Sequence, residues 1–163
     1  MKYLVTGAAG FIGYHVCLSL LESNKIVYGL DDINNYYDVK LKKERLKNLQ
    51  YFKKFKFKKL DISDYNNLKK TFKLFKPSVI IHLAAQAGVR YSIKNPHAYT
   101  KSNLVGFANI LECSRASKIK HLIFASSSSV YGNTKNIPFK EEENLNSPIS
   151  YYAATKLSNE VMA

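Results

Sequence analysis

The chain has 163 residues, 46% of them hydrophobic, which is enough for one ordinary domain with a sizeable core. Its formal net charge is +13, but the basic residues are scattered over polar faces rather than clustered, which argues against a nucleic-acid site. No apolar run approaches the ~20 residues that span a bilayer, and the first residues enter a strand without room for a signal peptide, so we expect a cytoplasmic protein.

The first half of the chain alternates short apolar runs with stretches of helical periodicity. We predict a strand at residues 2–5, a helix over about 11–23, a strand at 25–30 that ends at Asp31 and Asp32, a basic helix near 39–49, a strand that ends at Leu60 and Asp61, and a helix over about 64–75. Pro77 breaks this last helix.

The second half continues the alternation. We predict an apolar strand at 79–83, a long helix from Pro96 through Leu111, a strand at 121–125 that leads into four serines, and a last helix from near Ile149. The two cysteines, Cys17 and Cys113, fall in helical, mainly apolar patterns, so we expect them to fill the core rather than form a disulfide or a metal site.

Short apolar strands that alternate with helices predict an α/β fold, a Rossmann-like doubly wound parallel sheet with helices on both faces. Ligands bind such sheets beyond the carboxyl ends of the strands. The last helix reaches Ala163 without a stop signal. We therefore expect residues 1–163 to be one domain that is incomplete at its carboxyl end.

A glycine triplet lies between the first strand and the first helix. Gly7, Gly10 and Gly13 are three residues apart, which allows a tight turn, brings backbone amides near a pyrophosphate and seats the helix against the sheet. The helix begins with Phe11 and Ile12, and its N-terminus adds a partial positive charge. This loop is therefore a candidate dinucleotide-binding site.

Acidic residues end the next two strands. Asp31, with Asp32 beside it, lies close to the ~20-residue offset expected of a ribose-binding carboxylate. Such a carboxylate accepts hydrogen bonds from the ribose and repels a 2′-phosphate, which predicts NAD rather than NADP; a solvated turn residue is the alternative for Asp31. Asp61 and Ile62 end another strand at the same edge and are candidates to flank the adenine.

Tyr152 and Lys156 are four residues apart in the last predicted helix and so share one face. The Lys156 ammonium would favour the phenolate of Tyr152, which is otherwise a poor base at neutral pH. Ser127 follows the strand at 121–125 and could donate a hydrogen bond to the reacting oxygen. A tyrosine and lysine at this spacing occur by chance in many helices, but together with the glycine triplet they predict redox chemistry at a hydroxyl group.

Five stretches are far longer than a generic fingerprint, namely LAAQAGVRYS at 83–92, NPHAY at 95–99, SNLVGF at 102–107, ASSSSVYG at 125–132 and YAATK at 152–156. On these residues the chain resembles the extended short-chain dehydrogenase/reductase family, specifically the NAD-dependent epimerases/dehydratases. It is most similar there to the UDP-glucuronate 4-epimerases, and the resemblance runs from Met1 to Ala163.

The resemblance implies roles for the serines, the tyrosine and the lysine. Ser127, Tyr152 and Lys156 match the catalytic residues, and Tyr152 and Lys156 also bind the nicotinamide end of the cofactor. Ser128 and Ser129 are expected beside the carboxylate of the sugar. The 4,6-dehydratases carry an Asp–Glu pair at these two positions, and UDP-glucuronate decarboxylases usually carry Glu at the second, so the two serines favour an epimerase.

Further residues are assigned by the same resemblance. Leu83, Ala84 and Ala85 match a loop that runs along the cofactor, and Asn103 matches a polar residue that supports the active site. Arg90 is a candidate substrate-binding residue, with a structural ion pair as the alternative.

The resemblance implies an NAD-dependent enzyme that inverts C4 of UDP-glucuronate through a 4-keto intermediate. A 4-epimerase of another UDP-sugar, such as UDP-glucose or UDP-galactose, and a non-catalytic NAD-binding or basic binding module stay open. Family members carry a second half that supplies most of the UDP-sugar pocket, so we expect residues 1–163 alone to be an inactive NAD-binding domain. We expect the full-length form to be a homodimer that binds no nucleic acid, membrane or metal.

Overall fold

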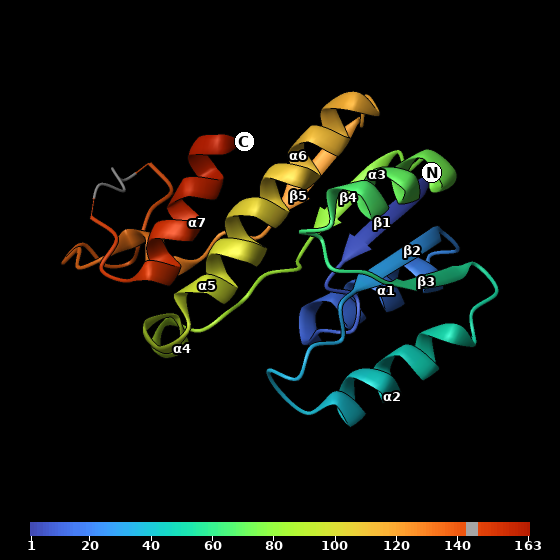
Figure 1. Cartoon of the computed structure of the whole chain (residues 1–163), viewed down its shortest axis with the longest axis horizontal. Coiled ribbons are helices and arrows are strands. Elements are labelled where there is room, and N and C mark those ends of the chain that lie inside the picture. The colour runs from blue at the N-terminus through green and yellow to red at the C-terminus, as the bar shows by residue number, and fades with distance from the viewer. Residues whose placement is uncertain (143–146) are drawn as a thin grey trace. The chain divides into compact units, whose positions relative to one another are not determined.

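The computed structural model of the protein describes residues 1–142 and 147–163, which divide into two compact units (Figure 1). Unit 1 holds residues 1–84 and 109–125, and unit 2 holds the described residues of 85–108 and 126–163. Unit 1 contains the sheet, whereas unit 2 is built from helices and turns.

The sheet of unit 1 has five parallel strands in the order β3-β2-β1-β4-β5. They are β1 (Lys2–Thr6), β2 (Ile26–Asp31), β3 (Phe55–Lys59), β4 (Val79–His82) and β5 (His121–Phe124). Because β1 pairs with both β2 and β4, the order of the strands reverses beside β1, and ligands of doubly wound sheets bind at such a switch point. The predicted Rossmann-like parallel sheet is confirmed.

Helices cover both faces of this sheet. Successive strand residues point to opposite faces, so Leu4 joins one core cluster and Val5 the other. The Leu4 cluster includes side chains of α3 (Tyr65–Phe75) and the last turns of α6 (Gly106–Ala116), and the Val5 cluster includes side chains of α1 (Phe11–Glu22) and α2 (Val39–Gln50). Burial on both faces explains why the inner strands β1 and β4 are mainly apolar, whereas the edge strand β3 alternates phenylalanine with lysine.

Cys17 and Cys113 are buried, one in each cluster, and both are free thiols. Burial raises the pKa of Cys17 to about 12 and that of Cys113 to about 11, so both thiols stay protonated and unreactive at neutral pH. The prediction that they fill the core is confirmed.

Unit 2 is organised around α7 (Tyr151–Met162), whose first turn is capped by the Ser150 hydroxyl, which accepts a hydrogen bond from the Ala153 N–H at 3.0 Å. The helix packs against four other elements of the unit. These are α4 (Val89–Lys94), α5 (Pro96–Tyr99), a π-helical turn (Thr100–Val105) and a 3₁₀ turn (Ser128–Tyr131).

The long helix predicted from Pro96 is confirmed, but it is not uniform. It runs through α5, the π-helical turn and α6 to Ala116. A π-helical turn inside an α-helix is rare and is frequent at functional sites. None of the helices in the described ranges combines the length and the apolar character that a membrane crossing requires.

Candidate functional site

The glycine loop of unit 1 has no room for a larger residue at Gly7 or Gly13. Gly7 has φ +71°, and a Cβ atom there would lie 2.8 Å from the backbone nitrogen of Ala84. A Cβ atom on Gly13 would lie 2.7 Å from the carbonyl carbon of Gly7. The first glycine thus allows the loop to touch the segment after β4, and the last allows α1 to start directly against the loop.

The N-terminus of α1 faces this loop without a side-chain cap. Gly10 is the N-cap residue and donates its own N–H to the Gly7 carbonyl oxygen at 3.0 Å. The first turn contains no acidic residue, so no side chain competes with an external anion for the helix N-terminus. Phe11 and Ile12 begin the helix and are 66% and 61% exposed, which leaves an apolar surface beside the amides.

Asp31 ends β2 and is tied directly to the glycine loop. One carboxylate oxygen accepts a hydrogen bond from the Ala9 N–H at 3.1 Å, and the other accepts from the Ile33 N–H at 2.8 Å. The side chain is buried, and burial raises the pKa of its carboxyl despite these hydrogen bonds and the positive charge of Lys42. Asp31 is therefore an ordered part of the loop, not a solvated turn residue.

The other residues predicted at the carboxyl ends of these strands differ in exposure and in their hydrogen bonds. Asp32 is half-buried and accepts hydrogen bonds from the backbone and side-chain N–H groups of Asn34, each at 3.0 Å. Asp61 is also half-buried and accepts from the Ser63 N–H and hydroxyl. The Ile62 side chain packs into the Leu4 core cluster. Of Asp61 and Ile62, the two residues predicted to flank the adenine, only Asp61 therefore has an accessible side chain.

Thr6, at the end of β1, fixes the segment after β4. Its hydroxyl oxygen accepts hydrogen bonds from the N–H groups of Leu83 and Ala84, both at 3.1 Å, and lies 2.7 Å from His82 Nδ1. The predicted residues Leu83 and Ala84 are half-buried, and Ala85, the first residue of unit 2, is exposed.

These features of unit 1 fit a dinucleotide. The tight loop that Gly7 and Gly13 allow, the uncapped N-terminus of α1 and the buried Asp31 carboxylate are suited to a pyrophosphate and a ribose. Within residues 1–142 and 147–163, no group of three or more His, Cys, Asp or Glu side chains is arranged to hold a metal ion.

Tyr152 and Lys156 lie in the first two turns of α7 in unit 2. Tyr152 is half-buried, while Lys156 is 5% exposed. Burial lowers the pKa of the Lys156 ammonium from 10.5 to about 8. At neutral pH the lysine therefore still carries its charge, inside a region where a positive charge acts strongly on its neighbours.

Two residues hold Tyr152 from the side of α4 and α5. The buried Ser92 hydroxyl oxygen accepts a hydrogen bond from the Tyr152 N–H at 3.3 Å and donates to the Val89 carbonyl at 2.6 Å. The Tyr99 ring, fully buried, meets the Tyr152 ring edge to face at a centroid distance of 6.0 Å. The Tyr99 hydroxyl donates to the Ala87 carbonyl at 2.7 Å and is bonded to the Gly88 carbonyl.

Asn103 connects the π-helical turn with two other segments of unit 2. Its amide is 2% exposed; it accepts a hydrogen bond from the Gln86 N–H at 2.8 Å and donates to the Gln86 carbonyl at 3.0 Å. Its backbone carbonyl accepts from the Asn159 side chain of α7 at 2.7 Å. Asn103 therefore links three segments of unit 2 by buried hydrogen bonds, and its role in an active site stays a prediction.

The serine run is placed beside α7 within the same unit. Ser127 caps the 3₁₀ turn: its hydroxyl oxygen accepts a hydrogen bond from the Ser129 N–H at 3.2 Å, which leaves the hydroxyl hydrogen for another acceptor. Ser126 donates to the Glu160 carboxylate of α7. Ser128 is exposed and Ser129 half-buried. Arg90, also predicted as a site residue, is exposed on α4.

Sequence reasoning missed three side chains of unit 1, Tyr37, Lys42 and Arg45. Lys42 is 4% exposed, and its ammonium donates to the backbone and side-chain oxygens of Asn34 at 2.9 Å each. Tyr37 and Arg45 contact the carbonyl oxygen of Ala9 in the glycine loop. The signal available was the three-residue spacing of Lys42 and Arg45, which places them on one face of α2.

Sequence reasoning assigned no role to the partners of Tyr152 and Asn103 in unit 2. Ser92 and Tyr99 lie inside stretches that carry the resemblance, and Thr155 and Asn159 lie on α7. All four are buried polar side chains with hydrogen bonds inside the unit, and nothing in their spacing indicates which residues they contact.

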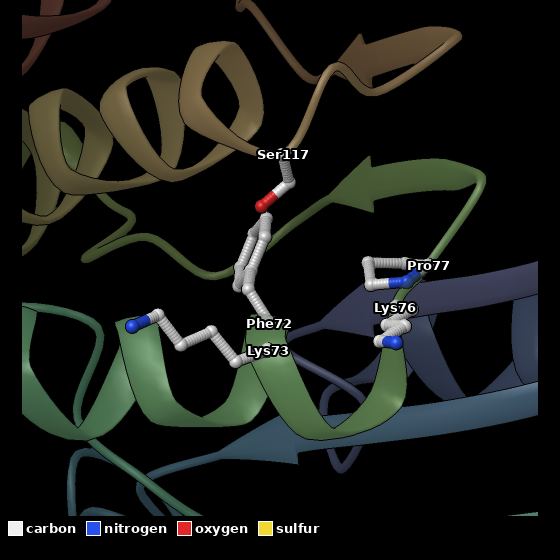
Figure 2. A pocket seen from close by; sticks show the side chains of 5 residues that line it. All are labelled: Phe72, Lys73, Lys76, Pro77 and Ser117. Carbon is white, nitrogen blue, oxygen red and sulfur yellow. The ribbon is translucent and has the colours of Figure 1, made fainter.

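A pocket of about 360 Å³ opens elsewhere in unit 1. Figure 2 shows the Phe72 ring pointing toward Ser117, with Lys73 and Lys76 to either side of it and Pro77 next to Lys76. These residues lie near the amino ends of β4 and β5, whereas the glycine loop follows the carboxyl end of β1. Because the strands are parallel, the pocket lies at the amino ends of the strands and the glycine loop at their carboxyl ends.

Comparison with known proteins agrees with the geometry. A family profile described as GDP-mannose 4,6 dehydratase matches residues 4–163. The chain is 53% identical over 163 residues to the protein CapI of Staphylococcus aureus, covering 100% of this chain and 48% of CapI. It is 45% identical over 161 residues to the UDP-glucuronate 4-epimerase of Thermodesulfobacterium geofontis, covering 99% of this chain and 50% of that protein.

A solved structure is similar over the same range. The UDP-glucuronic acid 4-epimerase from Bacillus cereus, in complex with UDP-glucuronic acid and NAD, matches with a TM-score of 0.90 and 37% identity, covering 99% of this chain and 51% of that chain. The chain thus spans about half the length of the relatives it matches. With the family profile covering nearly all of its residues, the chain belongs to the GDP-mannose 4,6 dehydratase family, among the NAD-dependent epimerases/dehydratases.

Proposed function

We propose that this chain is the cofactor-binding and acid–base half of an NAD-dependent UDP-glucuronate 4-epimerase. The observation that carries the proposal is the presence, in one chain, of the Gly7–Gly13 loop with its buried Asp31 and of Ser127 beside the helix of Tyr152 and Lys156. The two sets fall in different compact units. Their convergence on one sugar carbon is therefore part of the proposal.

The cofactor assignment follows from the residues of unit 1. The amides of the glycine loop and the N-terminus of α1 would hold the pyrophosphate, and Asp31 would accept hydrogen bonds from the adenosine ribose. The carboxylate would repel a 2′-phosphate, which favours NAD. When bound, NAD would supply the hydride acceptor and donor chemistry that reversible oxidation at C4 requires.

The residues of unit 2 would handle the proton. Tyr152 removes the proton of the C4 hydroxyl as the 4-keto sugar forms, and it returns a proton when C4 is reduced again. The Lys156 ammonium stabilises the phenolate that makes this possible. Ser127 would donate its hydroxyl hydrogen to the C4 oxygen, while its own oxygen accepts from the Ser129 N–H.

The substrate assignment depends on Ser128 and Ser129. A 4,6-dehydratase must eliminate water from C5 and C6, which needs an acid and a base where this chain has two hydroxyl groups. Reversible oxidation at C4 needs neither. Membership of a family named for a dehydratase therefore does not make this chain a dehydratase. The similarity to proteins named UDP-glucuronate 4-epimerase supports UDP-glucuronate as the substrate.

Activity is tested in a full-length form, made by joining this chain to the carboxyl-terminal half of a relative. We expect this form to convert UDP-glucuronate to UDP-galacturonate and to act much more weakly on UDP-glucose and UDP-galactose. A preference for the neutral sugars would instead favour the second candidate, a UDP-glucose 4-epimerase. We expect residues 1–163 alone to bind NAD but not to turn over either substrate.

The Tyr152→Phe variant of the full-length form tests the base. Removal of the hydroxyl is expected to lower kcat by about a thousandfold, within the range of acid–base catalysis, while NADH binding stays within about threefold. The matched control is Tyr151→Phe, which removes the neighbouring exposed hydroxyl. Near wild-type turnover by Tyr152→Phe would exclude Tyr152 as the base.

A further inference from the structure

Arg45 and Tyr37 hold the glycine loop of unit 1 from the side of α2. Arg45 Nη1 donates hydrogen bonds to the Ala9 carbonyl oxygen at 3.3 Å and to the Tyr37 hydroxyl at 3.0 Å. The Tyr37 hydroxyl donates to the same Ala9 carbonyl at 3.4 Å. Since the Ala9 N–H donates to Asp31, both backbone polar groups of Ala9 are fixed by side chains.

Ring contacts strengthen the same arrangement. The Arg45 guanidinium lies over the Phe11 ring at 5.7 Å and over the Tyr37 ring at 5.9 Å. The buried Lys42 ammonium lies over the Tyr37 ring at 4.5 Å while it binds Asn34. Arg45 therefore connects the chain before α2 with the first residue of α1, and Lys42 holds that chain against α2.

This arrangement has two consequences for an anionic ligand at the loop. The carbonyl oxygen of Ala9 carries a partial negative charge that opposes a bound pyrophosphate, and hydrogen bonds from a guanidinium offset that charge. A loop that is already fixed also loses less conformational freedom when a ligand binds, so the bound state is favoured.

We propose that Arg45 and Tyr37 are positioning residues that slow the release of the dinucleotide by holding Ala9 and the glycine loop in the binding conformation. This inference rests on the proposed function, since it requires NAD binding. It also fits that function: an epimerase must keep its cofactor until the hydride has returned to the same sugar, whereas a dehydrogenase exchanges its cofactor in every turnover.

The experiment measures NADH binding and release by the chain and its variants. NADH fluorescence is a direct signal because the reduced nicotinamide is excited at wavelengths where protein side chains do not absorb. NADH release is timed after addition of excess NAD. We expect Arg45→Met to raise the release rate and the Kd about tenfold, and Tyr37→Phe, which keeps the ring but loses the hydroxyl, to raise both about threefold.

Lys47→Met is the matched control, because it removes one positive charge from an exposed position of the same helix. It is expected to change release less than twofold, since distant exposed charges are screened. Arg45→Lys keeps the charge, but its side chain is one bond shorter than the distance to Nη1, the nitrogen that donates to both Ala9 and Tyr37, so it is expected to restore only part of the slow release.

The outcomes separate the two proposals. If the wild-type chain binds NADH and Arg45→Met releases it at the wild-type rate, the positioning role is wrong and the proposed function stands. Equal effects of Arg45→Met and Lys47→Met would overturn the inference as well, because loss of charge would explain both. If Arg45→Met does not fold, unchanged release by Tyr37→Phe overturns it. Absence of NADH binding to the wild-type chain overturns both proposals.

Discussion

The Asn103 side chain donates a hydrogen bond to the Thr155 hydroxyl at 3.1 Å, across 52 positions of the chain. Thr155 is the residue before Lys156, and its hydroxyl donates in turn to the Tyr152 carbonyl at 2.8 Å. A single buried amide in the π-helical turn is thereby connected to the turn of α7 that carries the proposed base and its lysine partner. The orientation of that turn depends on Asn103.

The Asn103→Ala variant tests this dependence. It leaves the Gln86 backbone groups and the Thr155 hydroxyl without their partner in a buried region, so it is expected to lower the free energy of unfolding by about 2–4 kcal/mol. Urea unfolding followed by circular dichroism measures the change. Asn66→Ala, at an exposed position of α3, should change it by less than about 0.5 kcal/mol. Similar losses in the two variants would contradict the proposed role.

The Gly13→Ala variant tests the fit of α1 to the glycine loop. Because its Cβ atom would lie 2.7 Å from the Gly7 carbonyl carbon, the loop has to move, and NADH affinity is expected to fall more than about tenfold. Gly10→Ala is the milder control, since its Cβ would lie 3.1 Å from the Gly7 carbonyl oxygen. In an unconstrained helix, Gly→Ala stabilises by about 0.5–1 kcal/mol. Tighter binding or higher stability of Gly13→Ala would therefore contradict the packing described here.

The sheet could be predicted from the sequence because strands that are buried on both faces need apolar residues at successive positions. The strands β1, β2, β4 and β5 are mainly apolar, β3 alternates phenylalanine with lysine, and each helix between strands repeats its apolar residues at helical spacing. The π-helical turn left no such pattern, since one extra residue in a turn barely changes the periodicity. The short helix α4 was not predicted either; it follows Gly88, which has φ +96°, and is too short for a periodic pattern to show.

The candidate site was predictable where a residue type is required by backbone geometry, as at Gly7 and Gly13. Nothing in the sequence distinguishes Lys42 and Arg45 from the other basic residues of the predicted helix near 39–49, because a lysine or arginine in a sequence does not reveal its partners. In the structure one is buried against Asn34 and the other binds Ala9, contacts that depend on how α2 packs beside the loop.

The Asp31→Asn variant tests the proposed ribose carboxylate. An amide at this position cannot accept from both the Ala9 and Ile33 N–H groups without turning its own NH₂ toward one of them, so NADH affinity is expected to fall about tenfold or more. Asp32→Asn should change affinity less than about threefold, because Asp32 contacts Asn34 and not the glycine loop. Fluorescence titration measures both. Equal binding by the two variants would contradict the assignment.

The same carboxylate predicts a pH dependence of binding. Burial raises the pKa of the Asp31 carboxyl, so its charge is lost at a higher pH than that of a surface aspartate. We expect NADH affinity to weaken on acidification of the wild-type chain while the fold is still intact. The Asp31→Asn variant has no such group and should lack this component of the pH profile, which a parallel circular dichroism measurement separates from unfolding.

Lys156→Met is expected to make the fold more stable while it removes the proposed activity. Burial lowers the pKa of Lys156 from 10.5 to about 8, so the folded state holds the charged form at a cost below pH 8. That shift corresponds to about 3 kcal/mol, and loss of the ammonium contacts offsets part of it, so a gain of about 1–2 kcal/mol at pH 7 is expected.

The stability difference between the wild type and Lys156→Met is expected to depend on pH. Between pH 8 and 10.5 the unfolded chain still binds the proton that the folded chain has released, so wild-type stability rises with pH relative to Lys156→Met by about 3 kcal/mol and stops changing relative to the variant above about pH 10.5. Urea unfolding of both proteins at pH 7, 9 and 10.5 measures it, with Lys47→Met as the exposed control that should show no such trend. Two results would contradict this prediction: a Lys156→Met variant that is less stable than the wild type at pH 7, or a stability difference that stays constant over this pH range. Either would show that burial of the Lys156 ammonium does not destabilise the fold.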